Sequence, residues 1–263
     1  MVTIATGKPE APFRILITGA SGGLGEALAR HYAGTGRHIA LWGRKINRLQ
    51  EVSEMCRKAG ATASIRSLDL SDGNAAIAAL RDEDIESPLD LAIFCAGLGD
   101  IQTATDLAED PQQVARLGLI NFVAPAAMAA AIAQRMASRR SGRIVLIGSA
   151  ASFHALPFAA AYAGSKAGLT RFAEALRIGV APHGVRVTLI SPGFIDTAAG
   201  RKVAGPKPFL MDGDVVAARI AFASERGVAH LVLPAPFIAL RWLDRLLPRS
   251  LRDRLLLSLA PTE

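Results

Sequence analysis

Cysteine is scarce in this chain, with only Cys56 and Cys95 among 263 residues. Two cysteines at this separation form neither a disulfide framework nor the spacing of a metal site, so we expect no bound metal. Cys95 lies in an apolar run and is expected to be a small buried hydrophobic side chain. The cysteine usage favours a cytoplasmic protein.

Long apolar runs and linkers are absent as well. No apolar run reaches the length of a membrane span, and residues 1–12 lack the apolar core of a signal peptide. No Pro/Ser-rich linker, charge block or internal repeat divides the chain, and 51% of it is hydrophobic, ample for one core. We expect a loose arm over residues 1–12, one domain over residues 13–235 and an extension over residues 236–263.

Acidic residues are outnumbered by basic ones, which gives a formal net charge of +7. Such a surface suits anions, including phosphorylated cofactors. The basic residues are scattered and no aromatic-interleaved patch accompanies them, so we expect no binding to nucleic acid.

Only two tyrosines occur, yet one of them lies in the most informative motif, Tyr162-Ala-Gly-Ser-Lys166, with Ser149 thirteen residues upstream. Residues four apart share one face of a helix, so the phenol and the ammonium would be neighbours. A nearby positive charge favours phenolate, and we predict that Lys166 lowers the pKa of Tyr162 for acid–base chemistry. The alternative is a tyrosine and a lysine on a solvated helix face.

A glycine motif near the N-terminus predicts a phosphate site. Residues 14–18 form an apolar, β-branched run typical of a buried strand, and a helical pattern begins at Glu26. Between them the spacing Gly-x-x-x-Gly-x-Gly is formed by Gly19, Gly23 and Gly25. Glycines let the backbone approach a pyrophosphate while the first amides of the helix point at it. The domain over residues 13–235 is therefore predicted to bind a dinucleotide.

Strand and helix patterns alternate along the rest of the chain. Further strands are expected at residues 38–42, 63–68, 89–95, 143–148, 185–190 and 230–233. Helices are expected at residues 47–59, 74–81, 111–138 and 159–180. This order predicts an α/β fold: a single-domain, Rossmann-type, doubly wound parallel sheet of about seven strands, flanked by helices on both faces. Ligands of such sheets bind beyond the carboxyl ends of the strands, where the motifs converge.

In combination, the motifs resemble the short-chain dehydrogenase/reductase family, from about Phe13 to Pro234. They are Thr18-Gly19-Ala20-Ser21-Gly22-Gly23-Leu24-Gly25, Asp69-Leu70, Cys95-Ala96-Gly97, Asn121, Ser149, Tyr162 with Lys166, and Pro192-Gly193 with Thr197. The resemblance implies a complete catalytic tetrad of Asn121, Ser149, Tyr162 and Lys166. Cys95 departs from the family's usual asparagine, which puts the rigidity of the central sheet in doubt.

The resemblance implies hydride transfer between a nicotinamide and a ketone or secondary alcohol, in a homodimer or homotetramer built through helices 111–138 and 159–180. Tyr162 would protonate the carbonyl oxygen that Ser149 orients. Lys166 would hold the nicotinamide ribose, and Asn121 would connect Lys166 to solvent through a water. Cofactor contacts are also implied for Gly19, Ser21, Gly22, Gly23, Leu24, Gly25, Asp69, Leu70, Ala96, Gly97, Tyr162, Lys166, Pro192, Gly193, Ile195 and Thr197.

Carboxylates are absent between Arg37 and Gln50, where an NAD enzyme carries the acidic residue that binds the adenosine ribose. Arg44 lies there instead and can pair with a 2′-phosphate in bidentate fashion. We therefore expect NADP(H) rather than NAD(H). The alternative is that Arg44 stacks on adenine or faces solvent and NAD is used.

The substrate, a small carbonyl or alcohol, is expected to meet two segments. Residues 193–211 are basic and poor in pattern, which is typical of a mobile lid or a solvated loop. An apolar wall is predicted from Ala151, Phe153, Ala155 and Phe194. Residues 237–247 and 249–259 predict two short amphipathic helices, with Arg241 and Arg245 on one face of the first. These helices could lie on an anionic membrane, pack over the substrate cleft or join another subunit.

The leading prediction is an NADPH-dependent carbonyl reductase or alcohol dehydrogenase. One alternative is a non-catalytic NAD(P)-binding regulator or scaffold, although such proteins usually lose a catalytic residue and this chain keeps all four. Another is a sugar-nucleotide epimerase or dehydratase, which commonly has a Gly-x-x-Gly-x-x-Gly turn and a larger C-terminal domain.

Overall fold

The computed structural model describes residues 12–99, 108–202 and 205–258, apart from the side chains of Lys202, Leu240 and residues 242–245. The predicted arm at residues 1–12 thus falls almost wholly outside the described residues. The proposed domain boundaries at residues 13, 235 and 236 stay predictions.

Seven parallel strands form one sheet in the order β3-β2-β1-β4-β5-β6-β9. The strands are β1 (Phe13–Thr18), β2 (Arg37–Gly43), β3 (Thr62–Ser67), β4 (Leu91–Phe94), β5 (Gly142–Ile147), β6 (Val185–Pro192) and β9 (His230–Leu233). The chain runs outward from β1 to β3 and then crosses back to β4, which creates the switch point beside β1. The predicted Rossmann-type α/β fold is confirmed.

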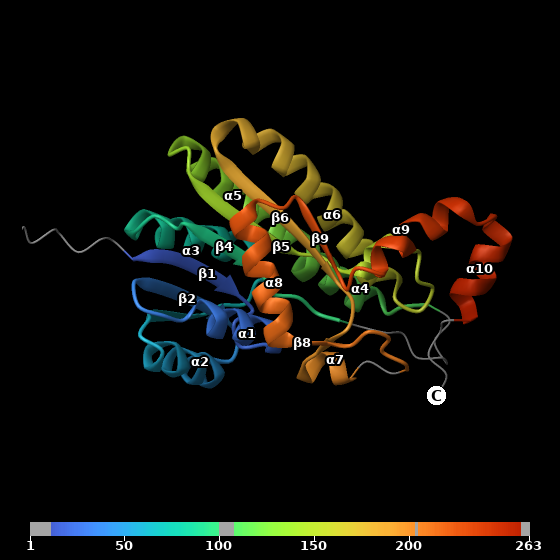
Figure 1. Ribbon diagram of the computed structural model, residues 1–263, viewed down its shortest axis with the longest axis horizontal. Helices are drawn as coiled ribbons and strands as arrows, with labels where there is room; N and C mark the ends of the chain where they lie inside the picture. The colour runs from blue at the N-terminus through green and yellow to red at the C-terminus, as the bar shows by residue number, and fades with distance from the viewer. Residues whose placement is uncertain (1–11, 100–107, 203–204, 259–263) are drawn as a thin grey trace, which may run out of the picture.

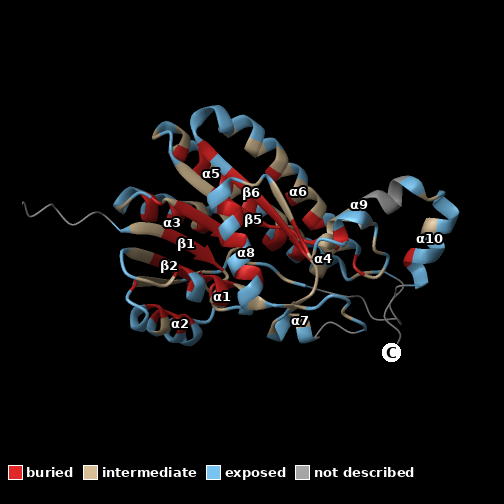
Figure 2. Ribbon diagram, viewed as in Figure 1, coloured by how far each residue is buried: buried red, intermediate tan, exposed pale blue. Residues whose placement is uncertain are grey.

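Helices cover both faces of the sheet (Figure 1). One face carries α1 (Gly23–Tyr32), α2 (Ile46–Lys58) and α8 (Gly213–Arg226), and the other carries α3 (Gly73–Glu86), α5 (Ala124–Ser138) and α6 (Ala160–Val180). Successive strand residues point to opposite faces, so Ile15 and Ile17 pack in one apolar cluster while Leu16 packs in the other. Figure 2 shows the strands as the most buried part of the molecule.

The long helix predicted at residues 111–138 is interrupted. It runs as α4 (Pro111–Gly118), a π-helical turn η1 (Leu119–Val123) and α5. The expectation that no segment is long and apolar enough to span a membrane was wrong here, because mean hydropathy reaches 1.6 within this stretch. Of the most apolar 18 residues of this stretch, 61% are buried inside the fold, as is typical of a core helix. The π-turn widens the helix at Asn121.

Helix α8 was missed by the sequence patterns. Its start is capped by the side chain of Asp212, which accepts from the amides of Asp214 (2.8 Å) and Val215 (3.2 Å). Its end is closed by Gly227 in the left-handed region, at φ +67°. These two signals could have identified the helix.

The remaining elements lie around the carboxyl ends of the strands. The predicted lid contains β7 (Ile195–Asp196), α7 (Ala198–Lys202) and β8 (Met211–Asp212), and β7 pairs with β8. Short 3₁₀ turns η2 (Ala150–Phe153) and η3 (Ala181–His183) flank α6. The two predicted tail helices are present as α9 (Phe237–Leu246) and α10 (Arg249–Ser258), which extend from the body at this end of the molecule (Figure 1).

Candidate active site

The glycine turn after β1 is packed so closely that side chains would not fit. Gly19 is in the left-handed region at φ +72°, and a methyl group there would lie 2.8 Å from the backbone of Ala96. A methyl group on Gly25 would overlap the carbonyl oxygen of Gly19, and one on Gly23 would overlap Thr197. The turn therefore brings bare backbone to the N-terminus of α1, which is the arrangement that binds a pyrophosphate.

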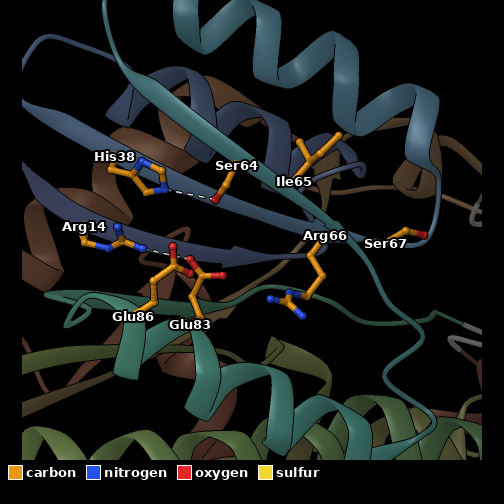
Figure 3. Close-up of a pocket in the computed structure, with 8 residues that line it drawn as sticks. All are labelled: Arg14, His38, Ser64, Ile65, Arg66, Ser67, Glu83 and Glu86. Carbon is orange, nitrogen blue, oxygen red and sulfur yellow. Dashed lines mark hydrogen bonds and ion pairs between the residues drawn. The ribbon is translucent and has the colours of Figure 1, made fainter.

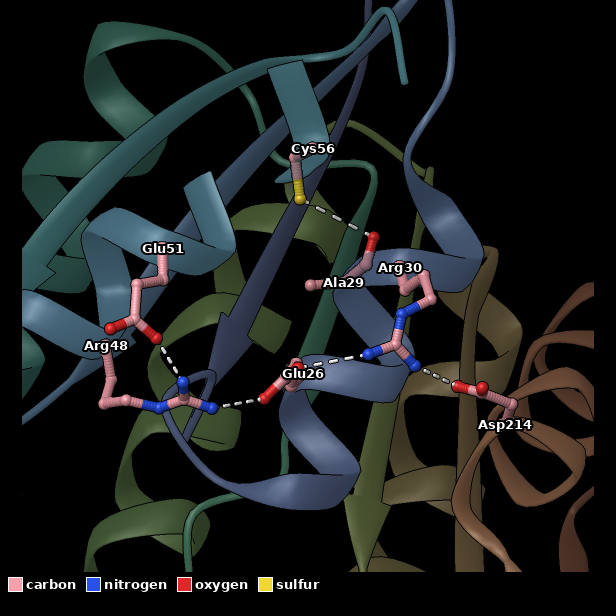
Figure 4. A network of polar contacts seen from close by, with 7 residues as sticks. All are labelled: Glu26, Ala29, Arg30, Arg48, Glu51, Cys56 and Asp214. Carbon is pink, nitrogen blue, oxygen red and sulfur yellow. Dashed lines mark hydrogen bonds and ion pairs between the residues drawn. The ribbon is translucent and has the colours of Figure 1, made fainter. Parts of the chain in front are cut away.

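Helix α1 is tied to the helices beside it (Figure 4). The carboxylate of Glu26 accepts from Arg30 (3.0 Å) and from Arg48 of α2 (2.7 Å), and Arg30 also pairs with Asp214 of α8 (2.5 Å). Arg48 pairs in addition with Glu51. Exposed pairs of this kind each contribute only about 0.2–1 kcal/mol. Their effect is mainly to fix how α1 presents its N-terminus to the cleft.

A cleft of about 410 Å³ opens above this turn. Thirteen of the predicted cofactor residues line it: Gly19, Ser21, Gly22, Gly23, Leu24, Gly25, Arg44, Asp69, Leu70, Ala96, Gly97, Ile195 and Thr197. It is also lined by residues that sequence reasoning missed: Thr18, Trp42, Gly43, Lys45, Leu68, Cys95, Leu98, Ile120 and Ala199. The bare glycine backbone, a cationic end and an apolar interior fit a phosphorylated dinucleotide.

Arg44 and Lys45 supply the cationic end of the cleft, and both are exposed. The carboxylate of Asp69 accepts from the amide of Ser71 at 3.0 Å. Hydrogen bonds from the backbone and side chain of Ser71, and then the charges of Arg44 and Arg116, lower the pKa of Asp69. Lys45 could have been found in the sequence as a second cation next to Arg44.

Cys95 directly follows β4, at the position where the short-chain dehydrogenase/reductase pattern usually has asparagine. The hydroxyl of Thr18 accepts from the amides of Cys95 (3.1 Å) and Ala96 (3.2 Å), so side chain and backbone tie β4 to β1 there. Cys95 is half-buried and lines the cleft, rather than being fully buried as expected. Its surroundings raise the pKa of the thiol to about 12, mainly through desolvation.

Lys166 is buried beneath the cleft, with 4% of its surface exposed. Its ammonium donates to the carbonyl oxygen of Ile147 at 2.9 Å. Burial lowers the pKa of Lys166 to about 8. A methyl group on Gly97 would lie 3.2 Å from Oδ1 of Asn121 and 3.4 Å from Nζ of Lys166, so these two side chains converge beside the end of β4.

Asn121 is fully buried in the π-turn. Its Oδ1 accepts from the amide of Leu98 and its Nδ2 donates to the carbonyl of Leu98, both at 2.8 Å. Nδ2 also lies 3.4 Å from the hydroxyl of Ser165. Asn121 thus fixes the loop after Gly97, and its predicted link from Lys166 to solvent stays a prediction.

The hydroxyl of Ser149 lies close enough to the phenol of Tyr162 to favour the phenolate. The hydroxyl of Ser149 also accepts from the amide of Ala151 at 3.1 Å, which caps η2. Burial raises the pKa of Tyr162, and the nearby hydroxyl of Ser149 opposes this shift only in part. The prediction that Lys166 lowers the pKa of Tyr162 was therefore wrong in this structure: desolvation of the phenol outweighs the groups that favour phenolate.

The C-terminal tail packs against the substrate end of the site. The ring of Phe237 occupies the space where Gly193 has no side chain, and it contacts the ring of Phe209 edge-on at 5.9 Å. The guanidinium of Arg241 lies 5.3 Å from the ring centre of Phe153, one residue of the predicted wall. Sequence reasoning did not anticipate this role for Phe237.

Pro192 and Gly193, predicted to contact the cofactor, do not line the cleft of about 410 Å³. Pro192 pairs with Leu233 in the sheet, and the amide of Gly193 donates to the carbonyl of Leu233 at 2.6 Å. The four tetrad residues lie beside this cleft rather than in its lining, because Lys166 and Asn121 are buried under Gly97. Their catalytic roles stay predictions.

A second cavity, of about 470 Å³, lies between the β2–β3 edge of the sheet and α3 (Figure 3). Four of its polar side chains form two pairs: Arg14 with Glu83 at 3.0 Å, and His38 with Ser64 at 3.1 Å. It contains none of the predicted site residues. The glycine-lined cleft is therefore the candidate active site.

Sequence comparison decides the family. The family described as short chain dehydrogenase matches residues 14–207. The chain belongs to the short-chain dehydrogenase/reductase family. An uncharacterized oxidoreductase of Myxococcus xanthus is 34% identical over 241 residues, 90% of this chain and 94% of that protein. A dehydrogenase/reductase SDR family protein 7-like of Anopheles gambiae is 35% identical over 190 residues, 70% of this chain and 59% of that longer protein.

Solved structures agree with this assignment. A short-chain dehydrogenase of Sphingobium yanoikuyae in complex with NADPH has a TM-score of 0.77 and 25% identity, covering 91% of this chain and 97% of that one. An alcohol dehydrogenase of Comamonas testosteroni shares the fold, with a TM-score of 0.76, 24% identity and 95% of each chain covered. This short-chain dehydrogenase/reductase is thus an oxidoreductase with a nicotinamide nucleotide-binding fold.

Proposed function

We propose that this protein is an NADPH-dependent carbonyl reductase or alcohol dehydrogenase that interconverts a ketone and a secondary alcohol. The observation that carries the proposal is the pairing of Ser149 with Tyr162, which lies on the helix that also bears the buried cation Lys166. This group lies at the carboxyl ends of the strands, next to a glycine-lined cleft. Proton transfer and dinucleotide binding are thereby brought together.

Each residue has a distinct task in this proposal. A bound nicotinamide supplies or accepts the hydride. Because its pKa is raised, Tyr162 keeps its proton at neutral pH and is ready to donate it to a carbonyl oxygen. The hydroxyl of Ser149 orients that oxygen by a hydrogen bond. Lys166 is the residue that would hold the ribose hydroxyls.

NADPH is the proposed cofactor because cations line the adenosine end of the cleft. Arg44 and Lys45 lie there, and no carboxylate occurs between Arg37 and Gln50. The relative from Sphingobium yanoikuyae, whose structure contains NADPH, lends support. Catalytic efficiency with NADPH and with NADH tests the proposal, and a preference for NADH would contradict it.

The reaction is tested by NADPH absorbance with a panel of bulky ketones, acyl-chain ketones and sugars. We expect at least one ketone to be reduced at a rate that saturates with substrate. NADPH binding without turnover of any carbonyl would instead favour a non-catalytic regulator or scaffold.

We also propose a homodimer or homotetramer built through α4, η1, α5 and α6. The proposal is supported by apolar side chains of these helices that are partly exposed to solvent. Their exposed fractions are 41% for Val114, 42% for Leu119, 46% for Val123 and 64% for Ile178. Light scattering of the purified protein tests this assembly, which a monomeric mass would exclude.

A further inference from the structure

Helix α10 exposes an apolar stripe flanked by arginines. Leu251 and Leu255 lie four residues apart and so share a face, with 52% and 37% of their surfaces exposed. Leu256, about 120° around the helix axis from the centre of this stripe, is buried, whereas the next residue, Leu257, is 63% exposed. Arg252 and Arg254 lie on either side of the stripe, each about 80° around the helix axis from its centre.

Helix α9 repeats this division between an inner and an outer face. Phe237 is only 7% exposed because it packs at Gly193. Leu246 lies nine residues later, on the opposite face of the helix, and is 77% exposed. In Figure 2 α10 is exposed along most of its length.

The lid adds aromatic and aliphatic surface beside the tail. Phe209 is 59% exposed and Leu210 is 46% exposed. The backbone of Phe209 lies in the left-handed region at φ +56°, which a bulky residue rarely adopts and which stores strain. Its ring contacts the buried ring of Phe237, so the lid packs against the inner face of α9.

The charge of the tail selects the kind of partner. Residues 237–258 contain five arginines and two aspartates. Within the described part of the chain, Arg249 and Arg254 have no carboxylate partner. A symmetric contact between two copies of this basic surface would bring like charges together, whereas an anionic surface complements it. Arginine also binds phosphate in bidentate fashion.

We propose that α9, α10 and the lid residues Phe209 and Leu210 form a docking surface for an anionic lipid bilayer. Leu246, Leu251 and Leu255 enter the headgroup–acyl boundary, while Arg249 and Arg254 pair with lipid phosphates. Arg252 pairs instead with Asp253 at 2.9 Å. The surface lies at the end of the molecule where the strands terminate, so docking brings the lid and the substrate end of the site to the membrane (Figure 1).

The test is co-sedimentation of the full-length protein with vesicles of phosphatidylcholine alone or mixed with an equal share of phosphatidylglycerol. We expect binding to the anionic vesicles, weakened by salt. The double variant Leu251→Glu, Leu255→Glu should bind at least about tenfold less, because each leucine loses the gain from leaving water. The double variant Arg249→Gln, Arg254→Gln should lose the preference for phosphatidylglycerol.

Ile85→Glu is the matched control, because Ile85 is 66% exposed on α3, away from the tail. It should bind vesicles like the unaltered protein, and circular dichroism should confirm that all variants are folded. Failure of the full-length protein to bind anionic vesicles would overturn the proposal, as would an equal loss in Ile85→Glu. If the leucine variant instead changed only the oligomeric mass, the surface would be an interface between copies and the proposal would be wrong.

Discussion

The ring of Phe237 fills the space that Gly193 leaves by having no side chain. This contact joins the C-terminal tail to the end of β6, next to the reaction site. A methyl group on Gly193 would overlap the ring, so Gly193→Ala must shift the ring of Phe237. We expect a stability loss of about 1–3 kcal/mol from overpacking. Catalytic efficiency should fall about tenfold as the site loses its geometry.

A double variant tests whether the loss in Gly193→Ala comes from the clash with Phe237 rather than from replacing a glycine as such. Adding Phe237→Ala to Gly193→Ala should restore much of the activity, because the ring is what the methyl group meets. Gly179→Ala on α6 is the control, since a methyl group there meets no atom within 4 Å. Thermal melting and steady-state kinetics measure both effects. Full activity in Gly193→Ala alone would show that the tail does not shape the site.

Lys166 is expected to cost stability while serving catalysis. Its pKa falls from 10.5 to about 8 on folding, so the fold disfavours the charged form. This shift corresponds to about 3 kcal/mol, offset by about 1 kcal/mol for the hydrogen bond to Ile147. Lys166→Met should therefore stabilise the protein by about 2 kcal/mol at neutral pH and abolish turnover. Denaturant unfolding provides the measurement, and a less stable variant would be the contrary result.

The lowered pKa of Lys166 also makes the stability and the activity of the protein depend on pH. Between about pH 8 and 10.5 the unfolded chain holds a proton on Lys166 that the folded chain has lost, so this group makes stability rise with pH in that window. Ketone reduction should fall above about pH 8 as Lys166 loses its charge, while Tyr162 stays protonated because its pKa is raised. A pH profile of kcat/KM with NADPH checks this. A rate that stayed constant up to pH 10.5 would speak against a charged lysine in the reaction.

Arg44 is predicted to read the 2′-phosphate of NADPH. Arg44→Ala should lower kcat/KM with NADPH about 10-fold to 100-fold, because charge-assisted hydrogen bonds contribute about 1.5–3 kcal/mol. Efficiency with NADH should change little. Arg57→Gln is the control, since Arg57 also lies on α2, donates to the carbonyl of Ala63 and does not line the cleft. Equal losses with both cofactors in Arg44→Ala would contradict the assignment.

The sheet and the glycine turn could be predicted because their signals are local. Apolar runs of strand length and the spacing of Gly19, Gly23 and Gly25 lie within short windows of the sequence. Helix α8 was missed although its cap Asp212 and its terminal Gly227 are also local. The π-turn at Asn121 had no comparable signal, because it depends on how α4 and α5 pack.

The properties that the sequence could not supply arise from burial and from distant contacts. The spacing of Tyr162 and Lys166 predicted a lowered tyrosine pKa, but desolvation raises it, and desolvation depends on the whole fold. Gly193 and Phe237 lie far apart in sequence, so no periodicity connects them. Cys95 lines the cleft because Thr18 holds the backbone there, which is a tertiary relationship.

The proton-donating role of Tyr162 is the centre of this account. Tyr162→Phe removes the phenolic hydroxyl and keeps the ring. With NADPH and a ketone that the unaltered protein reduces, we predict that kcat falls about 100-fold to 10,000-fold, the usual contribution of a positioned acid. NADPH affinity, measured by fluorescence titration, should stay unchanged. Undiminished turnover in Tyr162→Phe would contradict the proposed mechanism.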